Sequence, residues 1–318
     1  MTVPELLKGR RIDQRLKLRE LHVLSAVVEY GSMVKAAAQL AMSQPAVSAA
    51  IANLEAALGV RLLDRSPRGI EPTIYSRALL KRGRVAFDEL RQGLRDIEFL
   101  LDPAVGEVRV GCPEGTAAGF VPAVIDRLSR QHPRLVVHVV TAQTGKQEFR
   151  ELRERNVDIM LGQIFRPVLD EDINVEVISA NRLFVVTSSQ NTVARRRKIS
   201  LADLIDESWI FYPIDNVVGS FHADVFRRAG LELPPRHVIS FSLDVRMHLL
   251  ATGRYLTLLG TQVLRYNSER WSLKALPVNL RAPETPLAVF TLKNRTISPV
   301  AELFIEQVRR LAKLDLSA

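Results

Sequence analysis

The chain has 318 residues, 47% of them hydrophobic and 25% charged, which is the composition of an ordinary soluble globular protein with room for more than one domain. No apolar run is long enough to span a membrane, and the first residues, MTVPELLKGRRIDQRLK, lack the apolar core of a signal peptide, so we expect a cytoplasmic protein with no membrane partner. The single cysteine, Cys112, excludes an intramolecular disulfide, and its place after an apolar strand favours a buried side chain over a reactive thiol.

Basic residues are concentrated at the N-terminal end. Residues 1–84 hold 14 Lys and Arg against 7 Asp and Glu, whereas the rest of the chain is close to neutral. A positive field at one end attracts a polyanion to that end, so this distribution favours a nucleic-acid partner over a merely solvated surface.

Residues 32–58 read as two short helices joined by a tight turn, after a first helix over residues 18–30. Ser32 can cap a helix over residues 33–40, and Ser43 can cap the next one, with Pro45 in its first turn. In that last helix, four apolar side chains recur at helical spacing and predict a buried stripe: Val47, Ile51, Leu54 and Leu58. The opposite face is small and polar, and it suits a helix that enters the major groove of DNA.

After this helix, residues 60–63 and 69–73 flank the turn-rich loop DRSPRG and predict a small hairpin, or wing. Between Leu18 and Arg65 a characteristic set of residues recurs in order: Glu29, Gly31, Ser32, Ala36, Ala37, Leu40, Ser43, Gln44, Pro45, Ala46, Ser48, Leu54, Glu55, Gly59, Leu62 and Arg65. With these residues the stretch resembles the DNA-binding domain of LysR-type transcriptional regulators. The resemblance implies an all-α winged helix-turn-helix over residues 1–73 that binds double-stranded promoter DNA. The candidate contacts are Ser43, Gln44, Pro45, Ser48 and Ala49 on the helix, and Arg65 and Arg68 on the wing.

A long helix is predicted over residues 74–102, because Pro72 precedes it and Asp102-Pro103 ends it. Its apolar residues follow one another by alternating steps of three and four, as in a heptad seam: Leu80, Gly83, Phe87, Leu90, Leu94, Ile97 and Leu101. A helix packed within its own chain would show similar spacing. In the LysR-type family this position holds a linker helix that dimerises, which implies a homo-oligomer, dimer or tetramer. The candidate dimer contacts are Phe87, Leu90, Leu94, Ile97 and Leu101. Gly83 departs from the family pattern and would weaken the seam or approach the partner helix closely.

From residue 103 the pattern changes to strands that alternate with helices, which is typical of a parallel or mixed α/β sheet. Strands are expected at EVRVGC, LVVHVVT, VDIMLG, LFVVTS, SWIFYP, HVISFS, YLTLLG and LAVFTL, with helices near residues 121–130, 146–155 and 299–314. This part resembles the effector-binding domain of LysR-type regulators, which has two lobes like a periplasmic binding protein. The implied division is an effector domain over residues 103–318, with lobe I over 103–180 and 285–318 and lobe II over 181–284.

Catalytic and cofactor motifs are absent from the sequence. The six histidines show no metal-ligand spacing, and no phosphate-binding or dinucleotide-binding glycine motif occurs, so we predict no metal, no cofactor and no enzyme activity.

Ligands of open α/β sheets bind beyond the carboxyl ends of the strands, where two lobes face each other. The residues after the predicted strands give the candidate effector contacts Glu114, Gly115, Thr116, Gln143, Thr144, Lys146, Gln163, Asp215, Asn216 and Ser220. Many members of the family carry Ser or Thr at the position of Gly115, and Lys146 is the nearest candidate counter-charge for an anion.

The sequence thus indicates a LysR-type transcriptional regulator that binds promoter DNA as a homo-oligomer and responds to a small molecule, with RNA polymerase as a further candidate partner. A narrower similarity links GVRLLDRSPRGIEPTIYSRALLKRG to the subgroup of regulators of galactose-binding protein and of protocatechuate catabolism. The alternative is a two-lobed small-molecule binding protein or enzyme with an accessory helical domain, and salt-dependent binding to duplex DNA would separate the two.

Overall fold

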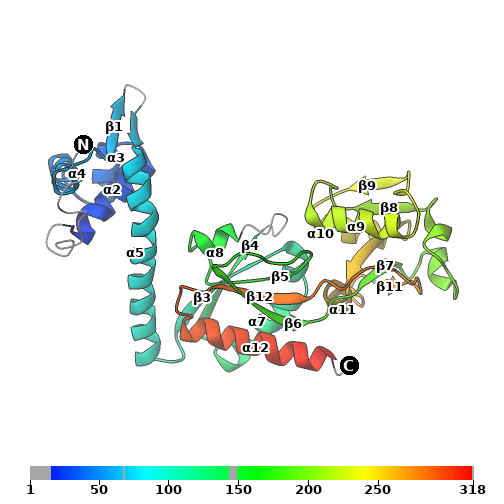
Figure 1. Cartoon of the computed structure of the whole chain (residues 1–318). Helices are drawn as coiled ribbons and strands as arrows, with labels where there is room; N and C mark the ends of the chain where they lie inside the picture. The colour runs from blue at the N-terminus through cyan, green and yellow to red at the C-terminus, as the bar shows by residue number, and fades with distance from the viewer. Residues whose placement is uncertain (1–15, 67–68, 143–148, 317–318) are drawn as a thin grey trace. The chain divides into compact units, whose positions relative to one another are not determined.

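The computed structural model describes residues 16–66, 69–142 and 149–316, which belong to two compact units, Met1–Arg91 and Gln92–Ala318 (Figure 1). No helix of the described residues is long and apolar enough to cross a membrane. The two units are taken in turn.

The first unit contains three helices, a hairpin and the beginning of a long helix. In chain order these are α2 (Leu18–Tyr30), α3 (Met33–Gln39), α4 (Gln44–Leu58), β1 (Leu63–Ser66), β2 (Gly69–Pro72) and α5 (Ile74–Leu101). Ser32 and Ser43 cap α3 and α4 as predicted, since their Oγ atoms accept hydrogen bonds from the backbone N–H groups of Lys35 and Ala46, each 3.4 Å away. The left-handed φ of Gly59, 68°, ends α4, which confirms the predicted stop.

The predicted hairpin is also present, although its first strand begins at Leu63, where the predicted strand ended. Strands β1 and β2 pair antiparallel from Leu63 with Pro72 to Ser66 with Gly69. Glu55 of α4 holds the approach to this hairpin, because its Oε1 accepts hydrogen bonds from the backbone N–H groups of Leu62 (2.6 Å) and Leu63 (3.3 Å). The wing therefore has a fixed attachment to α4.

The first half of α5 packs against α2 within the first unit. Leu80 is buried, and the ring of Phe87 lies 5.8 Å from that of His22. A Cβ added to Gly83 would lie only 2.8 Å from Cδ2 of Leu21, so the missing side chain lets the two helices approach closely. The expectation that Gly83 approaches a partner helix is thus wrong, because it approaches a leucine of its own chain.

The second unit contains two mixed five-stranded sheets, each with its own helices. The first sheet has the order β4-β3-β5-β12-β6, formed by β4 (Leu135–Thr141), β3 (Gly106–Cys112), β5 (Ile159–Gln163), β12 (Leu287–Leu292) and β6 (Ile173–Ser179). Strand β3 is parallel to β4 and β5, and β12 is antiparallel to β5 and β6. The last strand of the chain thus returns to the first sheet, as expected.

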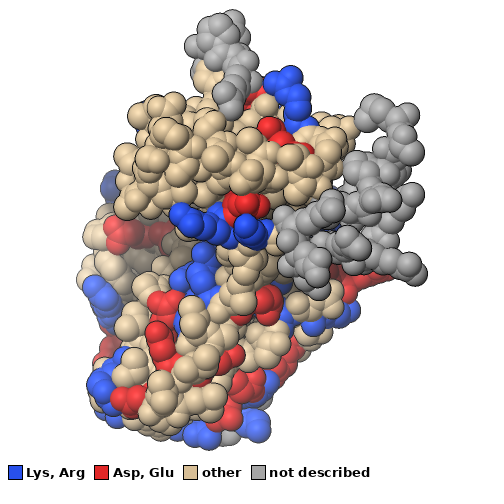
Figure 2. All heavy atoms as spheres, turned by 90° about the vertical axis from the view of Figure 1, so that its left-hand side faces the viewer, with Lys and Arg blue, Asp and Glu red and all other residues tan. Residues whose placement is uncertain are grey.

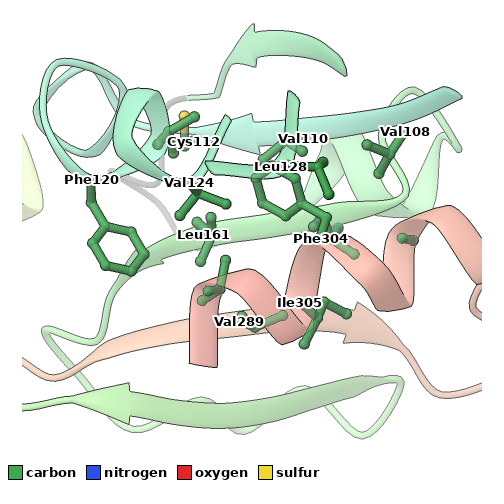
Figure 3. Packing of buried hydrophobic residues seen from close by; sticks show 14 of the residues in the cluster. Val108, Val110, Cys112, Phe120, Val124, Leu128, Leu161, Val289, Phe304 and Ile305 are labelled. Carbon is green, nitrogen blue, oxygen red and sulfur yellow. The ribbon is translucent and has the colours of Figure 1, made fainter. Parts of the chain in front are cut away.

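Helices α7 (Phe120–Gln131) and α12 (Pro299–Leu316) cover the first sheet and form its main core, together with apolar side chains of β3, β5 and β12 (Figure 3). Cys112 lies fully buried in this core, and burial raises the pKa of its thiol to about 12. The predicted burial of the Cys112 thiol is confirmed, and its lack of reactivity stays a prediction. The helix expected over residues 146–155 is described only as the short α8 (Arg150–Arg153), and residues 146–148 lie outside the described residues.

The second sheet has the order β11-β7-β10-β8-β9, formed by β11 (Leu273–Ala275), β7 (Leu183–Ser188), β10 (Tyr255–Gly260), β8 (Ser208–Phe211) and β9 (His237–Ile239). Around it lie the 3₁₀ turns η3 (Thr192–Arg195) and η4 (Ala202–Leu204) and the helices α9 (Val217–Arg228), α10 (Leu243–Ala251) and α11 (Thr261–Asn267). We call the part built on the first sheet lobe I and the part built on the second sheet lobe II.

The chain passes between the lobes twice, between β6 and β7 and between β11 and β12. Asn181 and Thr285 join these two crossings. The Asn181 Nδ2 donates to Thr285 Oγ1 (2.9 Å), and the Thr285 backbone N–H donates to the Asn181 carbonyl oxygen (3.0 Å). Both side chains are buried, so these hydrogen bonds hold the two crossing segments together.

Candidate functional sites

Helix α4 presents two different faces. The stripe of Val47, Ile51, Leu54 and Leu58 is buried, which confirms the sequence prediction. The face made of the candidate DNA contacts is open: Ser43, Gln44, Pro45 and Ala49 are exposed and Ser48 is half-buried. Figure 2 looks onto the side of the first unit where α4 lies, and few charged side chains are drawn there. The exposed face can therefore offer hydrogen bonds and close contact, but little charge.

The wing supplies the two remaining candidate DNA contacts. Arg65 lies in β1, and Arg68 lies outside the described residues.

A small cleft, open to solvent, lies between the two lobes of the second unit. Three candidate effector contacts line it from lobe I: Gly115, Thr116 and Gln163. A Cβ added to Gly115 would lie 3.4 Å from Cγ2 of Val263 in α11, so a Ser or Thr here would contact the opposite lobe. Gln143, Thr144 and Lys146 lie outside the described residues.

The other candidate effector contacts are not among the residues that line the cleft. Glu114 begins the short helix α6 (Glu114–Ala117), and Asp215 is exposed. Asn216 caps α9, because its Oδ1 accepts a hydrogen bond from the Val218 backbone N–H at 2.8 Å, and Ser220 follows one turn later. From this helix, Val218 and His222 line the cleft instead.

The polar groups of lobe II in the cleft were missed by the sequence patterns, above all Arg246. Its side chain is only 1% exposed. Its Nη2 donates to Thr257 Oγ1 and to the Leu258 carbonyl oxygen, both at 3.0 Å, and its guanidinium lies 4.2 Å from the ring centre of Tyr212. The Nε and Nη1 atoms of Arg246 have no hydrogen-bond partner among the described residues. Arg246 is also the only charged residue among the described residues that line the cleft.

The sequence did contain a signal for this arginine. Within LDVRMHLLA, the positions of Leu243, Arg246, Met247 and Leu250 share one helical face, and all four side chains are buried. An arginine on the buried face of a helix requires a partner, and this is the pattern that would have identified it.

His222 lies beside Arg246 in the cleft. Burial lowers the pKa of its imidazole to about 3, with a further contribution from the positive charge of Arg246, so the ring is neutral at physiological pH. Its Nδ1 has no hydrogen-bond partner among the described residues. His222 therefore adds no charge to the cleft.

Two aromatic side chains meet across the cleft. Phe165 follows β5 in lobe I and Phe221 lies in α9 of lobe II, and their rings pack edge to face with centres 5.4 Å apart. Elsewhere, the Asn267 Nδ2 of α11 donates to the Ala118 carbonyl oxygen of lobe I (3.2 Å). The lobes thus make direct contacts around a cleft whose described lining is mostly uncharged and includes one buried cation.

A helix-turn-helix with a hairpin in one unit and a two-lobed α/β domain with a cleft in the other are typical of a ligand-responsive DNA-binding protein, and comparison with known families agrees. Residues 18–76 match the bacterial regulatory helix-turn-helix protein family of lysR type, and residues 102–313 match the LysR substrate binding domain. The chain belongs to the LysR family and is a LysR-type transcriptional regulator with a helix-turn-helix DNA-binding domain and an effector-binding domain.

Individual relatives are similar over nearly the whole chain. The HTH-type transcriptional regulator GbpR of Azospirillum brasilense is 31% identical over 300 residues, which cover 94% of this chain and 87% of GbpR. Among solved structures, a full-length variant of OxyR from Pseudomonas aeruginosa matches with a TM-score of 0.65 at 17% identity, over 92% of this chain and 95% of OxyR. Full-length CbnR in complex with its target DNA matches with a TM-score of 0.51 at 24% identity, over 93% of this chain and 100% of CbnR. These structures agree with the fold described above.

The relatives of the chain are transcriptional regulators. Within the described residues, no group of three or more His, Cys, Asp or Glu side chains is placed to hold a metal ion.

Proposed function

We propose that the protein binds promoter DNA as a homo-oligomer through α4 and the wing, and that a small molecule in the cleft between the lobes alters this binding. The observation that carries the proposal is the pair of surfaces: an exposed, nearly uncharged face on α4, and a cleft with one buried, incompletely bonded cation. The same proposal divides the chain into a DNA-binding domain (residues 1–73), a linker helix (74–102) and an effector domain (103–318), in which lobe II covers residues 181–284. It also includes a cytoplasmic location and the lack of enzyme activity. Contact with RNA polymerase stays a prediction from the family.

The proposed DNA contacts are the residues of the exposed α4 face together with the wing: Ser43, Gln44, Pro45, Ser48, Ala49, Arg65 and Arg68. The Ser43 Oγ accepts the hydrogen bond that caps α4, and Gln44 and Ser48 offer the other polar side chains of this face to base edges. Ala49 and its neighbour Ala50 offer only van der Waals contact, which leaves base recognition dependent on few hydrogen bonds.

The proposed dimer contacts are the exposed apolar residues in the second half of α5: Leu90, Leu94, Ile97 and Leu101. Phe87 is half-buried against the first unit and contributes less. The proposed effector contacts from lobe I are Gly115, Thr116 and Gln163.

DNA binding by the intact chain tests this function. Binding to fragments of its own promoter should weaken steeply with rising salt, because phosphate contacts release counterions. Gln44→Ala should weaken binding to the specific site by about 1–3 kcal/mol and relax discrimination at one base position. Fluorescence anisotropy with specific and random duplexes measures both effects.

Gln190→Ala is the matched control, since Gln190 is an exposed glutamine of lobe II. If Gln44→Ala bound both duplexes as the wild type does, α4 would not be the reading helix. If the wild type bound no duplex, the alternative of a two-lobed binding protein or enzyme would be favoured.

A further inference from the structure

The side chains of Arg295 in lobe I and Arg246 in lobe II are both little exposed, and their surroundings differ. In lobe I, Arg295 Nη2 lies 2.7 Å from Asp158 Oδ1, and Nη1 donates to the Val157 carbonyl oxygen at 2.8 Å. In lobe II, Arg246 lies at 1% exposure with no carboxylate partner among the described residues. A buried guanidinium without an anion is costly, because burial removes hydration that only a counter-charge replaces fully.

The neighbours of Arg246 hold it in place without neutralising it. Thr257 and Leu258 accept hydrogen bonds from Nη2 alone, and Tyr212 covers the guanidinium with its ring. The Nε and Nη1 atoms, which carry three of the five N–H donors of an arginine side chain, are left without a partner among the described residues. The fold therefore positions a cation at the cleft and leaves most of its hydrogen-bonding capacity unused.

The proposal rests on the function proposed above, in which the cleft is the effector site. We propose that the effector is a small organic monoanion, and that its carboxylate accepts a hydrogen bond from an unused N–H group of Arg246, at Nη1 or Nε. This assigns to Arg246 the counter-charge that the sequence patterns assigned to Lys146.

The remaining lining limits the ligand further. Of the described lining residues, the polar ones other than Arg246 are uncharged at neutral pH, and they include Thr116, Gln163, Asn181 and Thr285. Phe165 and Tyr212 supply aromatic surface, with leucine and valine side chains between them. One cation matches one negative charge, whereas a second negative charge would be desolvated without a partner. The cleft thus fits a monocarboxylate with an apolar body better than a dicarboxylate or a phosphate ester.

Binding of an anion to Arg246 requires a change in the shape of the cleft. The Nε and Nη1 atoms are closed off from solvent in the arrangement described, so an anion reaches them only after part of the cleft wall has moved. An anion then favours the arrangement in which these donors are open, and such a difference in affinity between two arrangements is what a ligand needs to shift an equilibrium.

Thermal unfolding of the full-length chain tests the proposal without knowledge of the natural effector. The probes are acetate with acetamide and benzoate with benzamide, two pairs that match in shape and differ in charge, with sodium chloride to equalise ionic strength. At saturating concentration at least one carboxylate should raise Tm by about 3 °C or more, while its amide does not. Arg246→Met should lose this rise, and in the absence of carboxylate its own Tm should not fall below that of the wild type, because an unpaired buried charge has been removed.

Arg254→Met is the matched control, because Arg254 is an exposed arginine of the same lobe outside the cleft, and it should keep the rise. Arg246→Lys is the second variant if Arg246→Met does not fold, and it should show a smaller rise than the wild type, since Lys lacks the planar set of donors.

The proposal is overturned if no carboxylate raises Tm, if carboxylate and amide act equally, or if the Arg246 variants keep the full rise. Salt-dependent DNA binding of the wild type is measured alongside. DNA binding without a carboxylate effect would remove this inference alone, whereas absence of DNA binding would remove the proposed function.

Discussion

Helices α4 and α5 both carry an apolar stripe at helical spacing, but only the stripe of α4 is buried along its whole length. In α5 the stripe is buried at Leu80 and Gly83, and it is exposed from Leu90 onward, with Leu94 at 63% and Ile97 at 55% exposure. The comparison shows that periodicity identifies the side chains that favour burial, but not the surface that buries them. For α4 that surface belongs to the same chain, and for the second half of α5 we propose that a second copy supplies it.

The largest expected effect is on the α4 side of the comparison. Leu54 is fully buried, so Leu54→Ala should destabilise the first unit by about 2–5 kcal/mol through lost burial and a residual cavity. Hydrogen exchange of the amides of α2 and α4 in the intact chain measures this loss. Val34→Ala, at an exposed position of α3, should change exchange little. Similar protection in both variants would mean that α4 is not held by this stripe.

The matching experiment on α5 replaces an exposed leucine. Leu94→Asp should leave the folding of the monomer nearly unchanged but weaken self-association by about 3 kcal/mol, roughly a hundredfold in the dissociation constant, because a charge replaces an apolar group in the seam. Sedimentation equilibrium measures the dissociation constant, and circular dichroism verifies the fold. Val136→Asp, on the exposed side of the edge strand β4, is the control at a surface outside α5. An unchanged mass for Leu94→Asp would remove the seam from the dimer.

The same comparison explains how far the sequence alone could predict this protein. Local patterns predicted α4, its caps and its buried stripe, since Ser43, Pro45 and Gly59 act within one or two turns of themselves. Contacts between distant residues were not predictable in this way. Gly83 and Leu21 lie far apart in the chain, and no spacing rule connects them. The expectation of a partner helix at Gly83 failed for that reason.

In the cleft, sequence patterns found the residues after strands of lobe I but not the polar groups of lobe II. An asparagine before a helix can bind a ligand or cap the helix, and the structure has Asn216 as a cap. Asn181 and Thr285 are separated by 104 residues and meet only because the chain crosses between the lobes twice. Arg246 was recognisable in principle, from its place on the buried face of α10 and only four residues after the predicted strand HVISFS.

The smallest expected effect concerns the cleft, where the buried imidazole of His222 has no hydrogen-bond partner at Nδ1 among the described residues. The imidazole of His222 has its pKa lowered to about 3 by burial and by the charge of Arg246, against 6.5 for an ordinary histidine. The unfolded chain therefore takes up a proton at His222 as the pH falls below 6.5, while the folded chain does not. The stabilising contribution is complete above pH 6.5 and is lost progressively as the pH falls from there toward 3.

Lowering the pH from about 7.5 to about 5.5 should thus cost the wild type about 1 kcal/mol at this position, and His222→Gln should lack this part of the loss. Urea unfolding of both proteins at the two pH values, in chloride buffer without carboxylates, measures the difference. The other five histidines are common to both proteins, so their titration cancels when the two pH dependences are subtracted. An equal loss of stability in both proteins would mean that His222 is protonated in the folded chain, and the cleft would then hold a second positive charge beside Arg246.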